Sequence, residues 1–173
     1  NSAKTAIGTT IMNCHFKNCA GSTVTSSKTG GAIVWPATGG AWQVLIKGNR
    51  FYKNVCDVSL IGTSQTVPQD VVIEDNIFSG PLDAVDCNLY LAGGSGMNGV
   101  VVRNNEFPCA QPALTSGAVA LYADMTGCVG IFSGNRFGAA GTTAGWGAAK
   151  AVAAIPVTVG IVQNYSDAGL IVR

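Results

Sequence analysis

A short phrase that returns at a nearly constant interval constrains this chain more than any other feature. Each copy holds an apolar run, a turn built on Gly or Asn, and an aromatic residue. Six copies occur, at residues 9–16, 44–51, 71–78, 100–107, 131–137 and 159–165. Their anchor residues are Cys14, Asn49, Asn76, Asn105, Asn135 and Asn164, at intervals of 35, 27, 29, 30 and 29 residues. A period of this length is typical of a solenoid or a propeller.

A second β-rich stretch follows each anchor and completes the repeating unit. These stretches are residues 32–35, 58–61, 89–91, 119–122, 150–153 and 170–172. A propeller blade needs four strands in about 40 to 50 residues, which is more than each repeat offers. We therefore expect a coil of parallel strands in which each repeat forms one turn.

The phrase VLIKGNRF illustrates how one turn would fold. Because strand side chains alternate between faces, Val44 and Ile46 should point inward and Lys47 outward, with Phe51 returning to the core after the bend. Such a bend needs positive φ, which Gly adopts freely and Asn more easily than most residues; Gly48-Asn49 supplies that chemistry. Stacked turns would place successive anchor Asn side chains about 4.8 Å apart, near enough for a ladder of amides. The anchors are therefore interpreted as structural.

These repeats and turns resemble the right-handed parallel β-helix family, which includes pectate-lyase-like enzymes and bacteriophage tailspikes. The resemblance extends over nearly the whole chain. It implies an all-β fold, a single-stranded right-handed parallel β-helix of about six coils, in one domain over residues 1–173. We also expect the chain to be a fragment or a processed part of a longer protein, since it begins at Asn1 without Met.

Composition limits the classes of partner. A hydrophobic content of 47% with 11% charged residues excludes disorder, and a net charge of +1 offers no basic field for nucleic acid. No apolar run is long enough to span a membrane. One His and no CxxC spacing argue against a zinc site, so we expect no metal or cofactor. We interpret the six Cys as mostly buried free thiols.

Two outward columns should run along the central repeats. Two residues before the anchors stand Lys47, Glu74 and Arg103, whose alternating signs favour register. Four residues before the anchors the chain has apolar residues where a solvated face should be polar. They are Leu45, Val72, Val101 and Ile131. Either a loop of the same chain covers this column or another subunit does, and we favour a homotrimer.

Catalysis needs carboxylates, and three Asp follow neighbouring anchors. Pectinase motifs such as Asn-Thr-Asp and Gly-His-Gly are absent, and no acidic run suggests a calcium-dependent lyase. Glycosidases of the tailspike kind have no short motif and place carboxylates on adjacent coils. Asp57, Asp83 and Asp86 would suit that arrangement, with one pKa raised by like charge. The alternative interpretation is that Asp is common in solvated turns.

Aromatic residues outside the phrase offer stacking surfaces for sugar rings. Tyr90, Tyr122 and Trp42 are the candidate glycan-binding residues, with core or interface packing as the alternative. Together these features predict a structural or adhesive virion component of a bacteriophage: a tailspike, fibre or capsid-decorating protein at the virion surface. The alternatives are a secreted polysaccharide-degrading enzyme, either a glycoside hydrolase or a lyase, and a bacterial surface adhesin.

Overall fold

The structure is a computed structural model that describes residues 5–19, 31–35, 40–62, 67–79, 88–92, 96–109, 123–125, 127–137, 159–166 and 169–171. Within these ranges the chain forms strands, turns and bends, and no helix. The fold is therefore all-β. The expected all-β class is confirmed.

The strands belong to three sheets. The first sheet contains β1 Thr5–Ile7, β2 Thr10–Met12, β5 Gly40–Lys47, β8 Gln69–Glu74, β11 Met97–Arg103, β14 Cys128–Ser133 and β16 Val159–Val162. The second sheet contains β3 His15–Lys17, β6 Arg50–Tyr52, β9 Ile77–Ser79, β12 Glu106–Cys109, β15 Arg136–Phe137, β17 Asn164–Ser166 and β18 Gly169–Ile171. The third sheet contains β4 Ile33–Trp35, β7 Val58–Ile61, β10 Leu89–Ala92 and β13 Ala123–Asp124.

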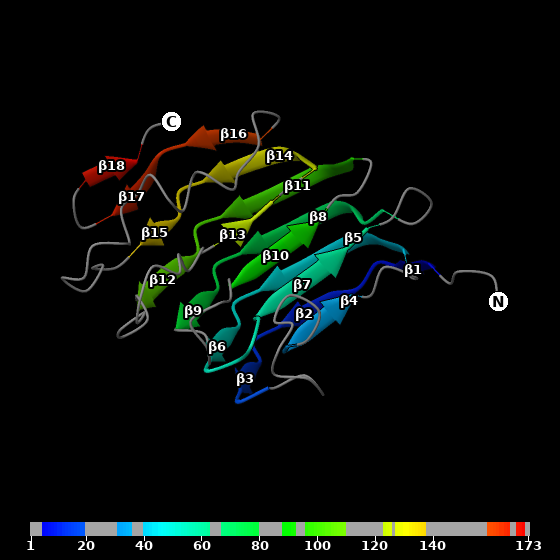
Figure 1. The fold of residues 1–173 in the computed structure, drawn as a ribbon, viewed down its shortest axis with the longest axis horizontal. Helices are drawn as coiled ribbons and strands as arrows, with labels where there is room; N and C mark the ends of the chain where they lie inside the picture. The colour runs from blue at the N-terminus through cyan, green and yellow to red at the C-terminus, as the bar shows by residue number, and fades with distance from the viewer. Residues whose placement is uncertain are drawn as a thin grey trace, which may run out of the picture.

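The chain visits the sheets in turn, as the run from β5 through β6 to β7 shows. Neighbours within a sheet come from successive repeats, in the order β5-β8-β11-β14-β16 in the first sheet. Figure 1 shows these strands side by side, with colours that progress from blue to red across the molecule. Among the described strands, all pairs are parallel except β17 with β18. This arrangement is compatible with a β-helix.

The core follows the expected alternation of side chains. Val44 and Ile46 are buried, and so are their partners in register, Val71 and Ile73. A second core element is a stack of Phe rings, with neighbouring centroids 5.1, 4.9, 5.0 and 5.0 Å apart. Its members are Phe16, Phe51, Phe78, Phe107 and Phe137. The repeat of the sequence is thus a repeat of core layers.

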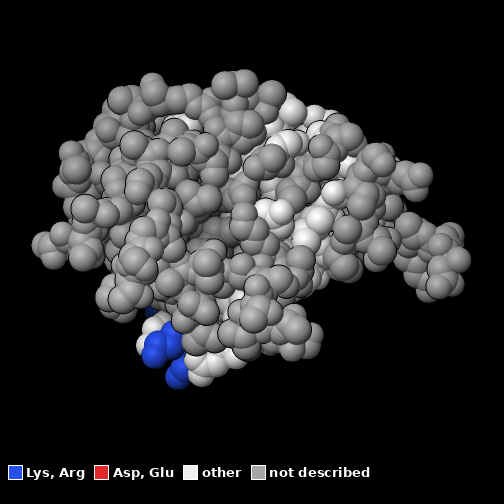
Figure 2. Space-filling view, viewed as in Figure 1, with Lys and Arg blue, Asp and Glu red and all other residues white. Residues whose placement is uncertain are grey.

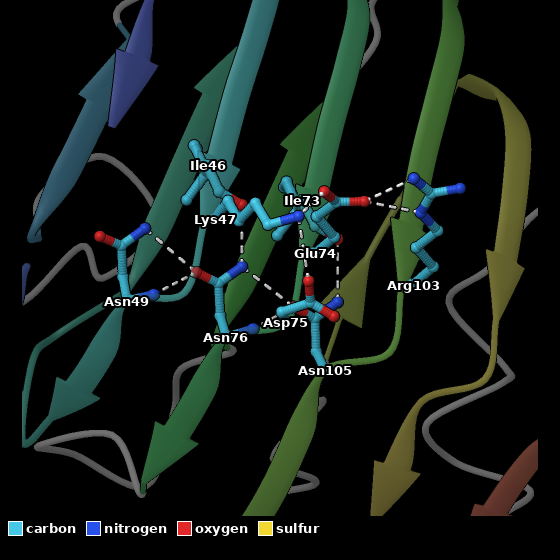
Figure 3. Close-up of polar contacts among 9 residues, drawn as sticks. All are labelled: Ile46, Lys47, Asn49, Ile73, Glu74, Asp75, Asn76, Arg103 and Asn105. Atoms are coloured by element: carbon cyan, nitrogen blue, oxygen red, sulfur yellow. Dashed lines mark hydrogen bonds and ion pairs between the residues drawn. The ribbon is translucent and has the colours of Figure 1, made fainter. Parts of the chain in front are cut away.

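The ladder of anchor amides is confirmed. The backbone N–H of Asn49 donates to Asn76 Oδ1 at 2.9 Å, and Asn76 makes the same bond to Asn105 at 3.0 Å. Each side-chain nitrogen also bonds the next side-chain oxygen, as Figure 3 shows for these three residues. The ladder continues through Asn135 to Asn164, and the N–H of Cys14 joins its other end through Asn49 Oδ1.

The bend before each anchor has positive φ at one residue only. The six positions are Asn13, Gly48, Asp75, Asn104, Gly134 and Gln163, with φ between 49° and 65°. The anchors themselves do not carry it. Left-handed geometry therefore belongs to the residue before the anchor, which leaves the anchor side chain free to point inward.

Two expectations needed correction. Each of the first four repeats has three described strands where two were expected, because a separate strand that contains the aromatic residue begins directly after the anchor. The segment around Leu170, which we expected to continue the parallel coil, pairs antiparallel with β17 and covers its edge. Tyr165 of the last phrase points outward and is 48% exposed, because the aromatic stands one residue earlier than in the other copies.

The pairing of β11 with β14 contains a register shift that lies away from the anchor. Phe132 pairs with Val102 and is buried, so the strand stays in register at the anchor. The register instead shifts between Met97 and Val100, where β11 has one residue more than β14. A bulge of this kind inserts a residue without disturbing the pairing beyond it.

The described cysteines are thiols that form no disulfide. Cys56 and Cys128 are buried, Cys14 is exposed and Cys19 is partly exposed. Cys87 and the side chain of Cys109 lie outside the described residues. The expectation of thiols without disulfides is confirmed for these four, and two of the four lie in the core.

Candidate functional site

Asp57 lies in the turn between β6 and β7 and is 1% exposed. Two amides bind its carboxylate: Asn54 Nδ2 donates to Oδ1 at 2.8 Å and Asn88 Nδ2 donates to Oδ2 at 2.7 Å. The backbone N–H of Asp57 also donates to the Asn88 carbonyl at 3.0 Å. The side chain thus joins its own repeat to the next one.

Burial raises the pKa of Asp57 to about 7, because a charged carboxylate loses its hydration there. The hydrogen bonds from Asn88 and Asn54 act in the opposite direction, since they favour the charged form, but the effect of burial is larger. A carboxyl with a pKa near neutrality has the proton affinity of a general acid. Its surroundings enclose it, so a sugar would reach it only after they move.

The other two predicted carboxylates, Asp83 and Asp86, lie outside the described residues. Their proximity to Asp57 therefore stays a prediction, as does the catalytic role of all three. Sequence reasoning missed Asn54 and Asn88, which hold the carboxylate. One signal was available for Asn54: it follows Cys19 by 35 residues and accepts its N–H at 2.9 Å, just as Asn49 follows Cys14 by 35 residues and accepts its N–H.

Two of the three predicted glycan-binding aromatics are described, and they belong to different sheets. Trp42 lies on β5 of the first sheet and is 49% exposed, with the exposed Ile7 beside it in register. Tyr90 lies on β10 of the third sheet and is partly buried. Tyr122 lies outside the described residues. The structure thus does not bring Trp42 and Tyr90 onto one sheet face.

The predicted apolar column is continuous in register across the first sheet. Leu45 pairs with Val72, Val72 with Val101, and Val101 with Ile131. Leu45, Val72 and Val101 are partly exposed and Ile131 is 46% exposed. Four neighbouring strands therefore present one apolar side chain each on the outer face, at the spacing of a parallel sheet.

A charged column runs beside the apolar one. Glu74 lies between two cations: Lys47 Nζ is 2.8 Å from Oε1, and Arg103 Nε is 2.7 Å from Oε2 (Figure 3). Lys47 Nζ also lies 3.3 Å from Asp75 Oδ2. The hydrogen bonds from Lys47 and then Arg103 lower the pKa of Glu74, and the bond to Glu74 raises the pKa of Lys47. The predicted contribution to register is consistent with this geometry, because each ion pair joins two adjacent strands.

Within the described ranges, no helix combines the length and apolar character that a membrane span requires. The same ranges hold no group of three or more His, Cys, Asp or Glu placed to bind a metal ion. Comparison with protein-family models, with curated proteins and with solved structures finds no match to this chain.

Proposed function

We propose that the chain is a right-handed parallel β-helix of about six coils and serves as a structural and adhesive component of a bacteriophage virion. A tailspike, a fibre or a capsid-decorating protein would suit this module. The resemblance of the repeated phrase to that of tailspikes supports the choice. So do the anchor amides, which bind one another along the core and thereby serve the fold.

The apolar column is the observation that carries the proposal. Four side chains in register, one on each of β5, β8, β11 and β14, give an apolar stripe on a face that solvent would otherwise cover. The adjacent ion pairs around Glu74 give the same face a defined charge pattern. In our proposal this face packs against two further copies of the chain, which form a homotrimer.

The mass of the purified chain in solution tests the assembly. Size-exclusion chromatography with light scattering should give three times the mass of one chain across micromolar concentrations. A monomer that remains folded over this range would contradict the trimer. Binding to immobilised bacterial lipopolysaccharide and capsule, measured in parallel, separates an adhesive role from a purely structural one.

A polysaccharide-degrading enzyme is the second candidate, and the raised pKa of Asp57 favours it. In that case the chain should release reducing ends, or unsaturated ends for a lyase, from bacterial capsule or lipopolysaccharide. Asp83→Asn and Asp57→Asn should each abolish turnover while Asp70→Asn, an exposed carboxyl on β8, should not. Inertness of the unmodified chain toward all these glycans would argue for the structural role.

A further inference from the structure

The outer face of β3 and β6 carries an aromatic ring among cations. These two strands pair in register, with His15 opposite Arg50 and Lys17 opposite Tyr52. All four side chains are exposed, and the Phe residues between them turn inward. Lys53 follows directly in the bend, also exposed. We call these five residues the Tyr52 surface.

Tyr52 is the centre of this surface and is 39% exposed. The Lys17 ammonium lies 5.7 Å from its ring centroid, and the Lys53 ammonium lies 5.3 Å from it. Both distances are within the range of a cation–π contact. Two positive charges, one from β3 and one from the bend after β6, are thus held at one phenol ring.

The cations of this surface have no acidic partner among the residues that the structure describes. Lys47 offers the contrast, because Glu74 lies 2.8 Å from its ammonium group. The whole chain has 10 Lys and Arg against 9 Asp and Glu. The excess of positive charge at the Tyr52 surface therefore reflects how the fold places these residues and not the composition of the chain. In Figure 2, Lys and Arg side chains gather at the end of the molecule where Figure 1 places β3 and β6.

The positive surface is short. The next strand of the second sheet, β9, presents Ile77 and Ser79 at the corresponding positions, and β12 then presents the acidic Glu106. A nucleic-acid strand needs a positive groove that follows its backbone over several nucleotides. Because β3 and β6 are three residues long each, the surface that they form suits a smaller anion, of one or two sugar rings.

We propose that the Tyr52 surface binds a negatively charged sugar unit of an acidic polysaccharide. The carboxylate or phosphate of that sugar would accept hydrogen bonds from Lys17, Lys53 and Arg50, which are charge-assisted donors. An apolar face of the sugar ring would pack against the exposed part of Tyr52. This inference deepens the proposed adhesive function and rests on it for the choice of a polysaccharide as the partner.

Equilibrium binding to defined polymers tests the proposal. The probes are polygalacturonate, a phosphate-bearing teichoic acid, neutral dextran and a single-stranded oligonucleotide, at 20 and 500 mM NaCl. We expect binding to one or both acidic polysaccharides, none to dextran, and at least a tenfold loss of affinity at the higher salt concentration. The two acidic probes distinguish a carboxylate from a phosphate.

Variants locate the binding. Lys17→Gln with Lys53→Gln should weaken binding to the acidic polysaccharide at least tenfold, and Tyr52→Ala should weaken it more than Tyr52→Phe. Arg136→Gln is the matched control, since Arg136 is an exposed cation on the same sheet beside Glu106. It should bind as the unmodified chain does. Because the Lys17, Lys53 and Arg136 side chains are exposed and Tyr52→Phe keeps the ring, the thermal unfolding of these variants should be unchanged.

Three results would overturn the inference: no binding to either acidic polysaccharide, equal losses in the double variant and in Arg136→Gln, or tighter binding of the oligonucleotide than of both polysaccharides. Failure here is separable from failure of the proposed function. Light scattering of the same samples reports the trimer, and binding to neutral bacterial glycans reports adhesion by another surface. The trimer, or adhesion through another surface, can be observed even if the Tyr52 surface binds no polysaccharide.

Discussion

Asn76 illustrates the contribution of one residue to a repeated fold. Its side-chain oxygen accepts from the backbone and the side chain of Asn49, and its side-chain nitrogen donates to the Ile46 carbonyl and to Asn105. The residue is completely buried. A shorter side chain would leave several buried donors and acceptors without partners, which costs more than the bonds themselves contribute.

Asn76→Ala should therefore lower the free energy of unfolding by roughly 2 to 4 kcal/mol. Urea denaturation followed by circular dichroism measures the change. Asn98→Ala is the control, because Asn98 lies exposed on β11; the same substitution there should change stability by less than about 0.5 kcal/mol. Similar losses at both positions would mean that the ladder adds nothing specific.

The raised pKa of Asp57 predicts how the free energy of unfolding depends on pH. Its pKa is raised from the ordinary 3.8 to about 7 in the folded chain, so between these values the folded state holds a proton that the unfolded state has lost. The stabilisation by protonated Asp57 is complete below the pKa that its carboxyl has in the unfolded state. It is lost as pH rises through the pKa of the folded state. Unfolding free energy should fall between about pH 4 and pH 7 by on the order of a few kcal/mol.

Asp57→Asn should flatten this dependence, since the variant cannot ionise at that position. Asp70→Asn should leave it intact, because Asp70 is exposed. Urea midpoints measured from pH 4 to pH 8 for the three proteins give the comparison. A pH profile of Asp57→Asn that matches that of the unmodified chain would disprove the assignment.

Within a strand, the distance to the neighbouring strand decides which side chains a position tolerates. Gly130 of β14 pairs with Val100 of β11 directly after the bulge, and a Cβ at Gly130 would collide with the Val100 carbonyl oxygen. Gly160 of β16 lies one strand further, where a Cβ would be 3.8 Å from the nearest atom, the Gly130 carbonyl oxygen. Position 130 of this sheet thus requires a residue without a side chain, whereas position 160 does not.

Gly130→Ala should destabilise the chain by about 3 kcal/mol or more, because backbone atoms of a central strand must move. Gly160→Ala should change stability by less than about 1 kcal/mol. Thermal unfolding of the two variants measures the difference. If Gly130→Ala proves as stable as Gly160→Ala, the strands at the bulge lie further apart than described.

For the whole molecule, assembly should depend on the apolar column and not on the core. Val101 lies near the middle of that column, between Val72 and Ile131. Val101→Lys places a charge within the proposed contact between copies, and burying an unpaired charge is strongly unfavourable. We expect a folded monomer by light scattering at micromolar concentration, with an unchanged circular dichroism spectrum.

Glu106→Lys is the control for that prediction. It introduces the same side chain at an exposed position of the second sheet, on a different face from the column. This variant should remain a trimer. Loss of the trimer in both variants would indicate a general effect of charge, and loss in neither would place the interface elsewhere.

The sequence alone predicted the features that depend on periodicity. Side chains in a strand alternate, and anchors at a near-constant interval stack, so the buried Val44 and Ile46, the ladder through Asn76 and the paired column around Glu74 all follow from spacing. The apolar column was predictable for the same reason. Each of these features needs only that equivalent residues of successive repeats lie side by side.

Only the tertiary structure decided the features that depend on what lies between the repeats. The antiparallel pairing of β18 and the bulge between Met97 and Val100 follow from no common interval, and the amides around Asp57 belong to a turn outside the repeated phrase. The burial that sets the pKa of Asp57 arises from all its neighbours together. A repeated sequence determines which residues of successive repeats lie side by side. Turns and sheet edges depend instead on packing against residues that have no counterpart in the other repeats.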